Sequence, residues 1–320
     1  KEPHQEQEIK TSFKEKRTIT DTVSQQVQEM YEENPYPRFK YSDYVARELA
    51  KPLYKFIEID TARKDLSFSE DLKSLTATPK VLIAGCGTGN QVIIASCYKN
   101  SQITAIDLSS SSLAYAIRKT KEYEMSNVTF KKMDLLNVAE LGEMFDIVAC
   151  SGVLHHMEQP ADGLSALLQQ LKPGGYIKLG LYSEIGRKII VDARDIIDKL
   201  KIKGTSEGIR DFRKKVLDGE IKILSNLPKC GRDFYSLSGC RDLCFHIQEH
   251  RYTTQKLQNI LDSHDLTFCG FIVREQIKNL YQEQFPEDSD MTSLAYWGEF
   301  EEKHPSTFAG MYQFWAHKSS

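Results

Sequence analysis

Short apolar runs alternate with amphipathic stretches from Lys80 to residue 182. The first run, residues 81–84, is continuous and ends in glycines, which is typical of a strand buried on both faces of a parallel sheet. The amphipathic stretches between such runs predict helices, so the alternation indicates βαβ units and a parallel sheet. We expect strands at 81–84, 102–106, 128–132, 145–150 and 176–182, and helices at 91–98, 112–124 and 161–171.

The alternation stops after residue 182. Residues 183–252 are mostly charged and have the pattern of helices, with no obvious strand. A helix at 253–265 and strands at 267–273 and 311–317 then resume the sheet, around a second irregular stretch at 275–309. The fold class we predict is α/β: a doubly wound, mostly parallel seven-stranded sheet with helical cap insertions.

The chain divides into four parts on this basis. Residues 1–20 are polar and are expected to form a mobile tail. Residues 21–78 are expected to form an N-terminal helical segment or lid, which the two prolines of Asn34-Pro35-Tyr36-Pro37-Arg38 interrupt. The sheet domain would comprise 79–182 and 253–320, and residues 183–252 would form a substrate cap.

Composition narrows the classes of partner. The chain has 42 Lys and Arg against 45 Asp and Glu, a net charge of −3, which argues against a surface dedicated to nucleic acid. No apolar run approaches the roughly 18–20 residues that span a bilayer, so we expect no membrane span. The seven cysteines are scattered and odd in number, which favours reduced thiols and a cytoplasmic protein. Nothing in the sequence favours one oligomeric state.

A glycine-rich turn follows the first expected strand and opens the first helix. Gly85, Gly87 and Gly89 allow the backbone to turn tightly and to lie close to a ligand. Position 90 is Asn, so the dinucleotide fingerprint G-x-G-x-x-G is not met. A smaller adenosyl cofactor is therefore favoured over a dinucleotide. The glycines could instead serve only strand-to-helix packing.

Two carboxylates end the next two expected strands. Asp107 stands where doubly wound folds place an acceptor for ribose hydroxyls, although it could also cap the helix that starts in the serine run 109–112. Asp134 ends the third strand region and could receive the exocyclic amine of adenine, with Leu135 flanking the ring. Both positions lie at the carboxyl edge of the sheet, where open α/β sheets bind ligands.

The segments VLIAGCGTGN, ITAIDLS, KKMDLLN, FDIVACSGVLHHMEQP and LKPGGYIKLGLY resemble, in this order, the motif set of class I S-adenosylmethionine (SAM)-dependent methyltransferases. The set is most similar to the type 11/12, quinone-biosynthesis-like branch. The resemblance implies SAM as cofactor, with Asp107 on the ribose, Asp134 and Leu135 around the adenine, and Ser151 and Gly152 beneath the sulfonium. The implied cofactor-binding set is Gly85, Cys86, Gly87, Gly89, Asn90, Gln91, Asp107, Leu108, Asp134, Leu135, Ser151 and Gly152. Residues 31–38 also resemble an N-terminal element of some bacterial methyltransferases.

Candidate catalytic residues follow the fourth and fifth expected strands. His155, His156 and Tyr182 stand near the place where the methyl group would point, and one of the histidines would act as a base or orient the acceptor. A base is needed only when the acceptor must lose a proton. The alternative is that both histidines only pack and form local hydrogen bonds.

Polar side chains of the lid and the cap are candidates for acceptor binding. Arginines and tyrosines suit an acceptor with a carboxylate or a phosphate, and the alternative is a solvated helical face. The candidates are Tyr36, Arg38, Arg187, Tyr235, Arg241 and His246.

The segment 246–250 has the letters H-x-x-E-H of an inverted metalloprotease motif, which would place His246 and His250 on one face of a helix. A third ligand is not evident, so we expect no metal site.

These observations favour a methyltransferase that acts on a small-molecule acceptor. A methyltransferase acting on a protein or nucleic acid is a second interpretation. A non-catalytic SAM-binding protein, or a metal hydrolase built on 246–250, is a third.

Overall fold

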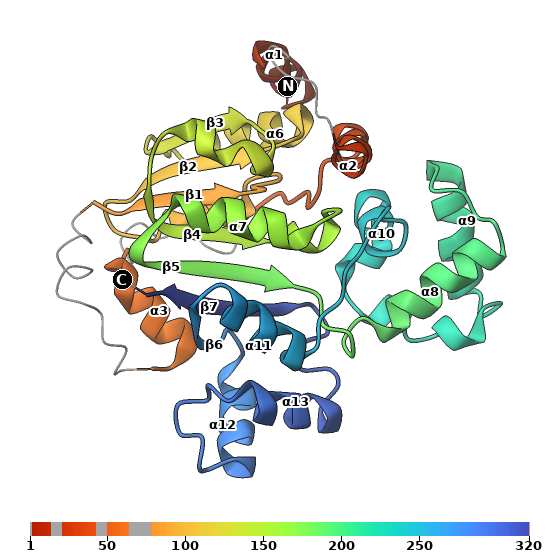
Figure 1. Ribbon diagram of the computed structural model, residues 1–320. Coiled ribbons are helices and arrows are strands. Elements are labelled where there is room, and N and C mark those ends of the chain that lie inside the picture. Colours follow the sequence, from red (N-terminus) through yellow and green to blue (C-terminus); the bar gives the residue numbers. More distant parts are fainter. Residues whose placement is uncertain (1, 14–20, 43–49, 64–77, 320) are drawn as a thin grey trace.

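The computed structural model describes residues 2–13, 21–42, 50–63 and 78–319. Its centre is a seven-stranded sheet with strand order β3-β2-β1-β4-β5-β7-β6, in which β7 is antiparallel to both of its neighbours. Figure 1 shows the sheet between layers of helices. The strands are β1 (Lys80–Ala84), β2 (Gln102–Asp107), β3 (Val128–Lys132), β4 (Phe145–Ser151), β5 (Leu171–Leu181), β6 (Leu266–Phe271) and β7 (Tyr312–Lys318).

This architecture confirms the predicted doubly wound, mostly parallel α/β sheet. Every strand expected from the sequence is present, with bounds that differ by at most a few residues except at β5. That strand begins at Leu171 instead of 176, because Leu171 already lies beside Phe145 of β4 before the Pro-Gly-Gly bend. The helices of the sheet domain are α3 (Leu53–Thr61), α5 (Asn90–Ala95), α6 (Ser110–Glu122), α7 (Pro160–Gln170) and α11 (Thr254–Ser263).

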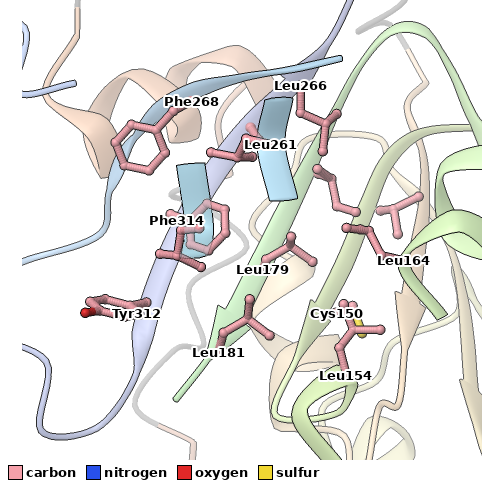
Figure 2. Packing of buried hydrophobic residues seen from close by; sticks show 14 of the residues in the cluster. Cys150, Leu154, Leu164, Leu179, Leu181, Leu261, Leu266, Phe268, Tyr312 and Phe314 are labelled. Carbon is pink, nitrogen blue, oxygen red and sulfur yellow. The ribbon is translucent and has the colours of Figure 1, made fainter. Parts of the chain in front are cut away.

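Alternate residues of the central strands enter different hydrophobic clusters. Val81 and Ile83 of β1 pack in the cluster that holds α3 and α5, whereas Leu82 and Ala84 pack in the cluster that holds α7 and α11. Successive side chains of a strand point to opposite faces, so both faces of the sheet are buried. Figure 2 shows the second cluster, with side chains of β5 close to Leu164 of α7 and Leu261 of α11.

The segment between β5 and α11 forms a helical unit with a hydrophobic core of its own. Its chain leaves and returns at one point, since Ser183 forms an isolated bridge with Tyr252. Phe212 and Phe234 are fully buried in its core. Figure 1 shows this unit beyond the arrowhead of β5. It contains α8 (Lys188–Lys199), α9 (Ser206–Leu217), α10 (Leu237–Cys244) and the 3₁₀ turns η4 (Lys222–Leu224), η5 (Leu227–Lys229) and η6 (Arg232–Tyr235). We call this unit the cap.

The second irregular stretch also folds into helices, α12 (Glu275–Gln284) and α13 (Leu294–Lys303). Stacked aromatic rings join them, with the ring centroids of Tyr281 and Trp297 4.0 Å apart. Figure 1 shows this pair at the β6 edge of the sheet, away from α10.

The N-terminal region differs from the expected mobile tail. Residues 2–12 form helix α1 (Glu2–Ser12), which lies along α6. Arg118 of α6, whose side chain is 5% exposed, donates to Glu6 of α1 at 2.7 Å. A polar segment of this kind can form a docked helix, because a helix without buried residues can be held by ion pairs. Residues 14–20 of that expected tail lie outside the described residues.

Helix α2 (Thr22–Glu33) and the following residues 34–38 cross the carboxyl edge of the sheet. We call residues 21–38 the lid. None of the helices in the described part of the chain is both long and apolar enough to cross a bilayer.

Candidate active site

A cavity of about 380 Å³ lies where β1, β2, β4 and β5 end, beneath the lid and beside α10. Its volume is in the range of small-ligand sites. The turns after the strands form one wall, which we call the strand-end wall. The lid, α10 and the end of β5 form the other, which we call the lid-cap wall. The two walls have different chemistry.

The glycines of the strand-end wall serve two purposes. Gly85 and Gly89 have φ angles of +70° and +91°, and a Cβ there would lie 2.2 Å from Val153 and 2.8 Å from Ala116. These two glycines therefore serve internal packing. Gly87, with φ of +51°, lines the cavity, and its Cβ would meet only the carbonyl oxygen of Tyr36, at 3.1 Å. Only Gly87 thus keeps space open between the loop and the lid.

Asp107 faces the cavity from the end of β2. Its two carboxylate oxygens accept the backbone N–H groups of Gly87 at 2.8 Å and Ser109 at 2.9 Å. Ser109, not Asp107, caps α6 by accepting the N–H of Ser112. Burial raises the pKa of Asp107 to about 6. The remaining lone pairs of this ionised carboxylate can accept ligand hydroxyls at neutral pH.

The ends of β2 and β3 supply the neighbouring part of the wall. One carboxylate oxygen of Asp134 accepts the N–H of Leu136 at 3.0 Å and so caps η2 (Leu135–Leu141), while burial raises the pKa of this group. Leu108 and Leu135 line the cavity on either side, and the lid residue Gln28 donates to the carbonyl of Leu108 at 2.9 Å. Carboxylate and apolar groups thus alternate along this wall.

The remaining strand-end residues join β4 to the start of α5. Gln91 donates to the carbonyl of Ser151 at 3.2 Å, and Gly152 donates to the carbonyl of Gly180. Cys86 and Asn90 line the cavity as well, and burial raises the pKa of the Cys86 thiol. All residues assigned to cofactor binding from the sequence line the cavity except Gly89.

The lid is attached to the sheet domain through its backbone carbonyls and acidic side chains. Thr88 donates to the carbonyl of Pro37, and Tyr115 to the carbonyl of Phe39. Glu32 accepts the hydroxyl of Ser111 at 2.7 Å and so lies at the N-terminus of α6, where a negative charge is favoured. These bonds hold the lid over the strand-end wall.

The lid-cap wall joins the lid to α10. Tyr31 of α2 donates its hydroxyl to a carboxylate oxygen of Asp242 at 2.6 Å, and both residues line the cavity together with Tyr36 and Tyr182. Asp242 is 6% exposed. Burial raises its pKa to about 7. This wall is therefore aromatic with one buried carboxyl group.

His156 lines the cavity, whereas His155 lies behind it. Nδ1 of His156 contacts the carbonyl of Gln248 at 2.7 Å, so it carries the proton, and Nε2 has no hydrogen-bond partner among the described residues. The His156 ring stacks on that of His246 at 3.4 Å between centroids, and burial lowers the pKa of His156 well below its usual value. A neutral His156 can accept a proton or a hydrogen bond. His155 packs instead against Tyr182, with centroids 3.9 Å apart.

Several expected acceptor-binding residues have other partners. Arg187 is 3% exposed; it pairs with Glu249 and lies 3.8 Å over the Tyr182 ring, so it positions that tyrosine. Arg241 pairs with Glu33 of the lid. Tyr36 alone among the six candidates lines the cavity; Arg38, Arg187, Tyr235, Arg241 and His246 do not. None of the arginines in the described part of the chain lines the cavity, so the expected match to a carboxylate or phosphate acceptor is not supported there.

Residues 246–250 do not form the helix that would place His246 and His250 on one face. Helix α10 ends at Cys244, and the following segment is irregular because its side chains bond in different directions. Glu249 pairs with Arg187, while His250 contacts the carbonyl of Met157 at 3.0 Å. Nowhere in the ranges that the structure describes do three His, Cys, Asp or Glu side chains form a possible metal site.

The sequence interpretation missed Asp242 and did not single out Tyr31 for the cavity. Asp242 is one of many acidic residues in a charged segment, and nothing in its local pattern distinguishes it. Tyr31 carried a weak signal because it opens the lid segment Tyr-Glu-Glu-Asn-Pro-Tyr-Pro-Arg.

Comparison with known proteins agrees with this geometry. A family model described as a methyltransferase domain matches residues 81–175. An uncharacterized protein of Synechococcus sp. is 36% identical over 211 residues, which are 62% of this chain and 49% of that protein. The ubiquinone biosynthesis O-methyltransferase of Pseudomonas fluorescens is 29% identical over 157 residues, 47% of this chain and 64% of that enzyme.

Residues 81–175 of this chain are a methyltransferase domain of the class I SAM-dependent type. The structure of PKMT2 from Rickettsia typhi has the same fold, with a TM-score of 0.61 at 18% identity over 88% of this chain and 54% of that one. Its complex with AdoHcy gives a TM-score of 0.58 at 17% identity, with coverage of 87% and 55%. The methyltransferase chain spans 49% of the Synechococcus relative and 64% of the Pseudomonas enzyme.

Proposed function

We propose that this methyltransferase binds SAM against the strand-end wall and transfers its methyl group to a small-molecule acceptor held against the lid-cap wall. The observation that carries the proposal is one cavity of about 380 Å³ shared by these two walls. The acceptor and the cofactor would therefore meet inside the protein.

The residues of the strand-end wall fit the cofactor. Asp107 offers lone pairs to ribose hydroxyls, Leu108 and Leu135 offer apolar surface to a base, and Gly87 leaves room beside the loop. Asp134 has a second carboxylate oxygen for an exocyclic amine. When bound, SAM supplies a methyl group on a sulfonium sulfur, so transfer forms a bond from the acceptor to the methyl carbon and breaks the carbon–sulfur bond, with the electron pair left on sulfur.

The protein contributes alignment and a dry site. The lid is bonded to both the sheet domain and α10, so it can hold the two reactants together and exclude water. His156 lines the cavity, and its buried Nε2 has no hydrogen-bond partner among the described residues, which makes His156 the candidate base for an acceptor that must lose a proton. Tyr182 is held by Arg187 and shapes the same wall.

The contact between the lid and α10 favours a small acceptor instead of a macromolecule. Tyr31 and Asp242 join α2 to α10 across the site, and this contact would have to open to admit a protein or nucleic-acid chain. The net charge of −3 gives no electrostatic attraction to a nucleic-acid backbone.

Label transfer tests the proposal. The full chain is incubated with methyl-labelled SAM and with a cell extract separated into a low-molecular-weight filtrate, a protein fraction and a nucleic-acid fraction. We expect label only in the filtrate, with release of one S-adenosylhomocysteine per methyl group transferred. Label confined to a macromolecular fraction would refute the small-molecule acceptor, and SAM binding without transfer would point to the non-catalytic alternative.

A further inference from the structure

The lid-cap wall carries a buried carboxylate that the surrounding protein does not neutralise. Asp242 receives one hydrogen bond, from Tyr31, and forms no ion pair with another described residue. Arg187 attracts it from a distance but is paired with Glu249, whose side chain is 1% exposed. A buried charge without a partner is costly, so above a pH of about 7, where this group ionises, the wall is suited to receive a positive group.

The other cations near the cavity are already in use. Lys178 lines it, but its ammonium pairs with Asp60 at 3.3 Å and lies 5.3 Å from the centre of the Trp315 ring. Arg241 pairs with Glu33 outside the cavity. Among the described residues, the wall thus presents no free cation to a carboxylate or phosphate acceptor.

Three tyrosines lie beside this carboxylate on the same wall. Tyr31, Tyr36 and Tyr182 come from α2, from the proline segment and from the residue after β5, and all three line the cavity with Asp242. The electron-rich faces of aromatic rings attract ammonium groups; the Tyr182 ring is already covered by Arg187 and His155, so Tyr31 and Tyr36 are the rings that can do so. Aromatic rings around a carboxylate recognise a cation that also has apolar surface.

We propose that the acceptor is an amine and that Asp242, with Tyr31 and Tyr36, forms the site that binds its ammonium group. This inference rests on the proposed function and names its substrate class. An aliphatic amine is present both in free metabolites and in lysine side chains, and the Tyr31–Asp242 contact across the site favours the former.

Asp242 has a second role in this arrangement. A protonated amine has no free electron pair, so it must lose a proton before it can form a bond to carbon. The proton passes from the ammonium nitrogen to the carboxylate of Asp242, which leaves a neutral amine with its lone pair and a neutral carboxylic acid. The groups that face Asp242 and set this balance are Tyr31, Arg187, Asp233 and Glu249. The proton is released to solvent when the lid opens.

The experiment identifies the atom that receives the methyl group. SAM carrying a ¹³C-methyl group is incubated with the full chain and with the filtrate and protein fractions of a ¹⁵N-labelled extract. We expect a product in the filtrate whose ¹³C-methyl signal shows one-bond coupling to ¹⁵N. The same coupling in the protein fraction alone would support the amine but refute the small-molecule source. A methyl signal without this coupling refutes the amine and leaves the methyltransferase activity intact, whereas transfer in no fraction overturns both proposals.

Matched variants connect the result to the proposed site. Asp242→Asn keeps the shape and an acceptor oxygen for Tyr31 but removes the charge. We expect the rate at low acceptor concentration to fall at least tenfold, while SAM affinity by calorimetry stays within twofold. Asp218→Asn, the same change at the exposed end of α9, should leave both quantities unchanged. An unchanged rate in Asp242→Asn would overturn the assignment of this residue.

Discussion

The two walls of the cavity are built in opposite ways. In the strand-end wall most residues stand at the end of a strand or in the turn that follows it, and backbone N–H groups hold a side chain such as Asp107, which accepts from Ser109. In the lid-cap wall the central contact joins Tyr31 to Asp242, which are 211 positions apart. The comparison teaches that the proposed cofactor site is built mostly from residues near the strand ends, whereas the proposed acceptor site depends on the docking of separate segments.

The largest effect is expected from a side chain that fills the space along the strand-end wall. Gly87→Val places a branched side chain where the loop faces the cavity and the lid, so we expect SAM affinity to fall by more than 100-fold, about 2.7 kcal/mol. Calorimetry measures the affinity and circular dichroism the fold. Gly142→Val is the control, since Gly142 also has a positive φ of +66° but no atom within 4 Å of its Cβ position. Equal losses in both variants would mean that backbone strain, not the cavity, explains the effect.

Asp107→Ala removes a charged acceptor from the same wall. We expect SAM affinity to fall roughly 10- to 150-fold, about 1.5–3 kcal/mol. Because the pKa of Asp107 is about 6 in the folded protein, the wild type should also bind SAM more weakly as the pH falls below 6. Ser109→Ala removes the cap of α6 instead and should change stability but not affinity. Unchanged SAM affinity in Asp107→Ala would remove the ribose assignment.

Asp242→Asn should raise the free energy of unfolding while it lowers turnover. This result would sharpen the comparison between the two walls. Burial raises the pKa of Asp242 from 3.8 to about 7, so between these values the folded state keeps a proton that the unfolded state has lost. The stability that this group contributes is therefore complete below pH 3.8 and is lost as the pH rises through 7.

The variant lacks this pH dependence. At pH 8 we expect the free energy of unfolding of Asp242→Asn to be about 1–3 kcal/mol higher than that of the wild type. At pH 4 this difference should nearly vanish. Urea unfolding at both pH values measures the two differences. A variant that is less stable at pH 8 would show that the carboxylate has a stabilising partner in the folded protein.

The smallest expected effects concern the ion pair that joins the lid to α10. Glu33→Gln and Arg241→Gln should each lower kcat/KM for the acceptor by at most about fivefold, since a partly exposed ion pair contributes up to about 1 kcal/mol. The double variant should match the single ones, and Tyr235→Phe, whose side chain is 54% exposed, should have no effect. If Arg241 instead binds the acceptor directly, as its residue type suggested, Arg241→Gln will be far more damaging than Glu33→Gln.

The sequence by itself determined the sheet and one wall of the site. A continuous apolar run such as 81–84 is buried on both faces of a sheet, and the polar residue that follows each parallel strand reaches one common edge. The order of the motifs therefore placed Gly87, Asp107 and Asp134 together without knowledge of any distant contact. The same local reasoning failed at 246–250, which belongs to a stretch predicted to be mostly helical but forms no helix.

Only the tertiary structure decided which polar side chains of the lid and the cap face the cavity. Arg187 and Arg241 looked suitable from their residue type, but Glu249 and Glu33, distant in sequence, occupy their guanidinium groups. Asp242 showed no local signal and faces the cavity because α10 docks against α2. The physical reason is that side-chain chemistry is local, whereas the partner that satisfies or exposes a charge is set by packing between segments that the sequence pattern does not relate.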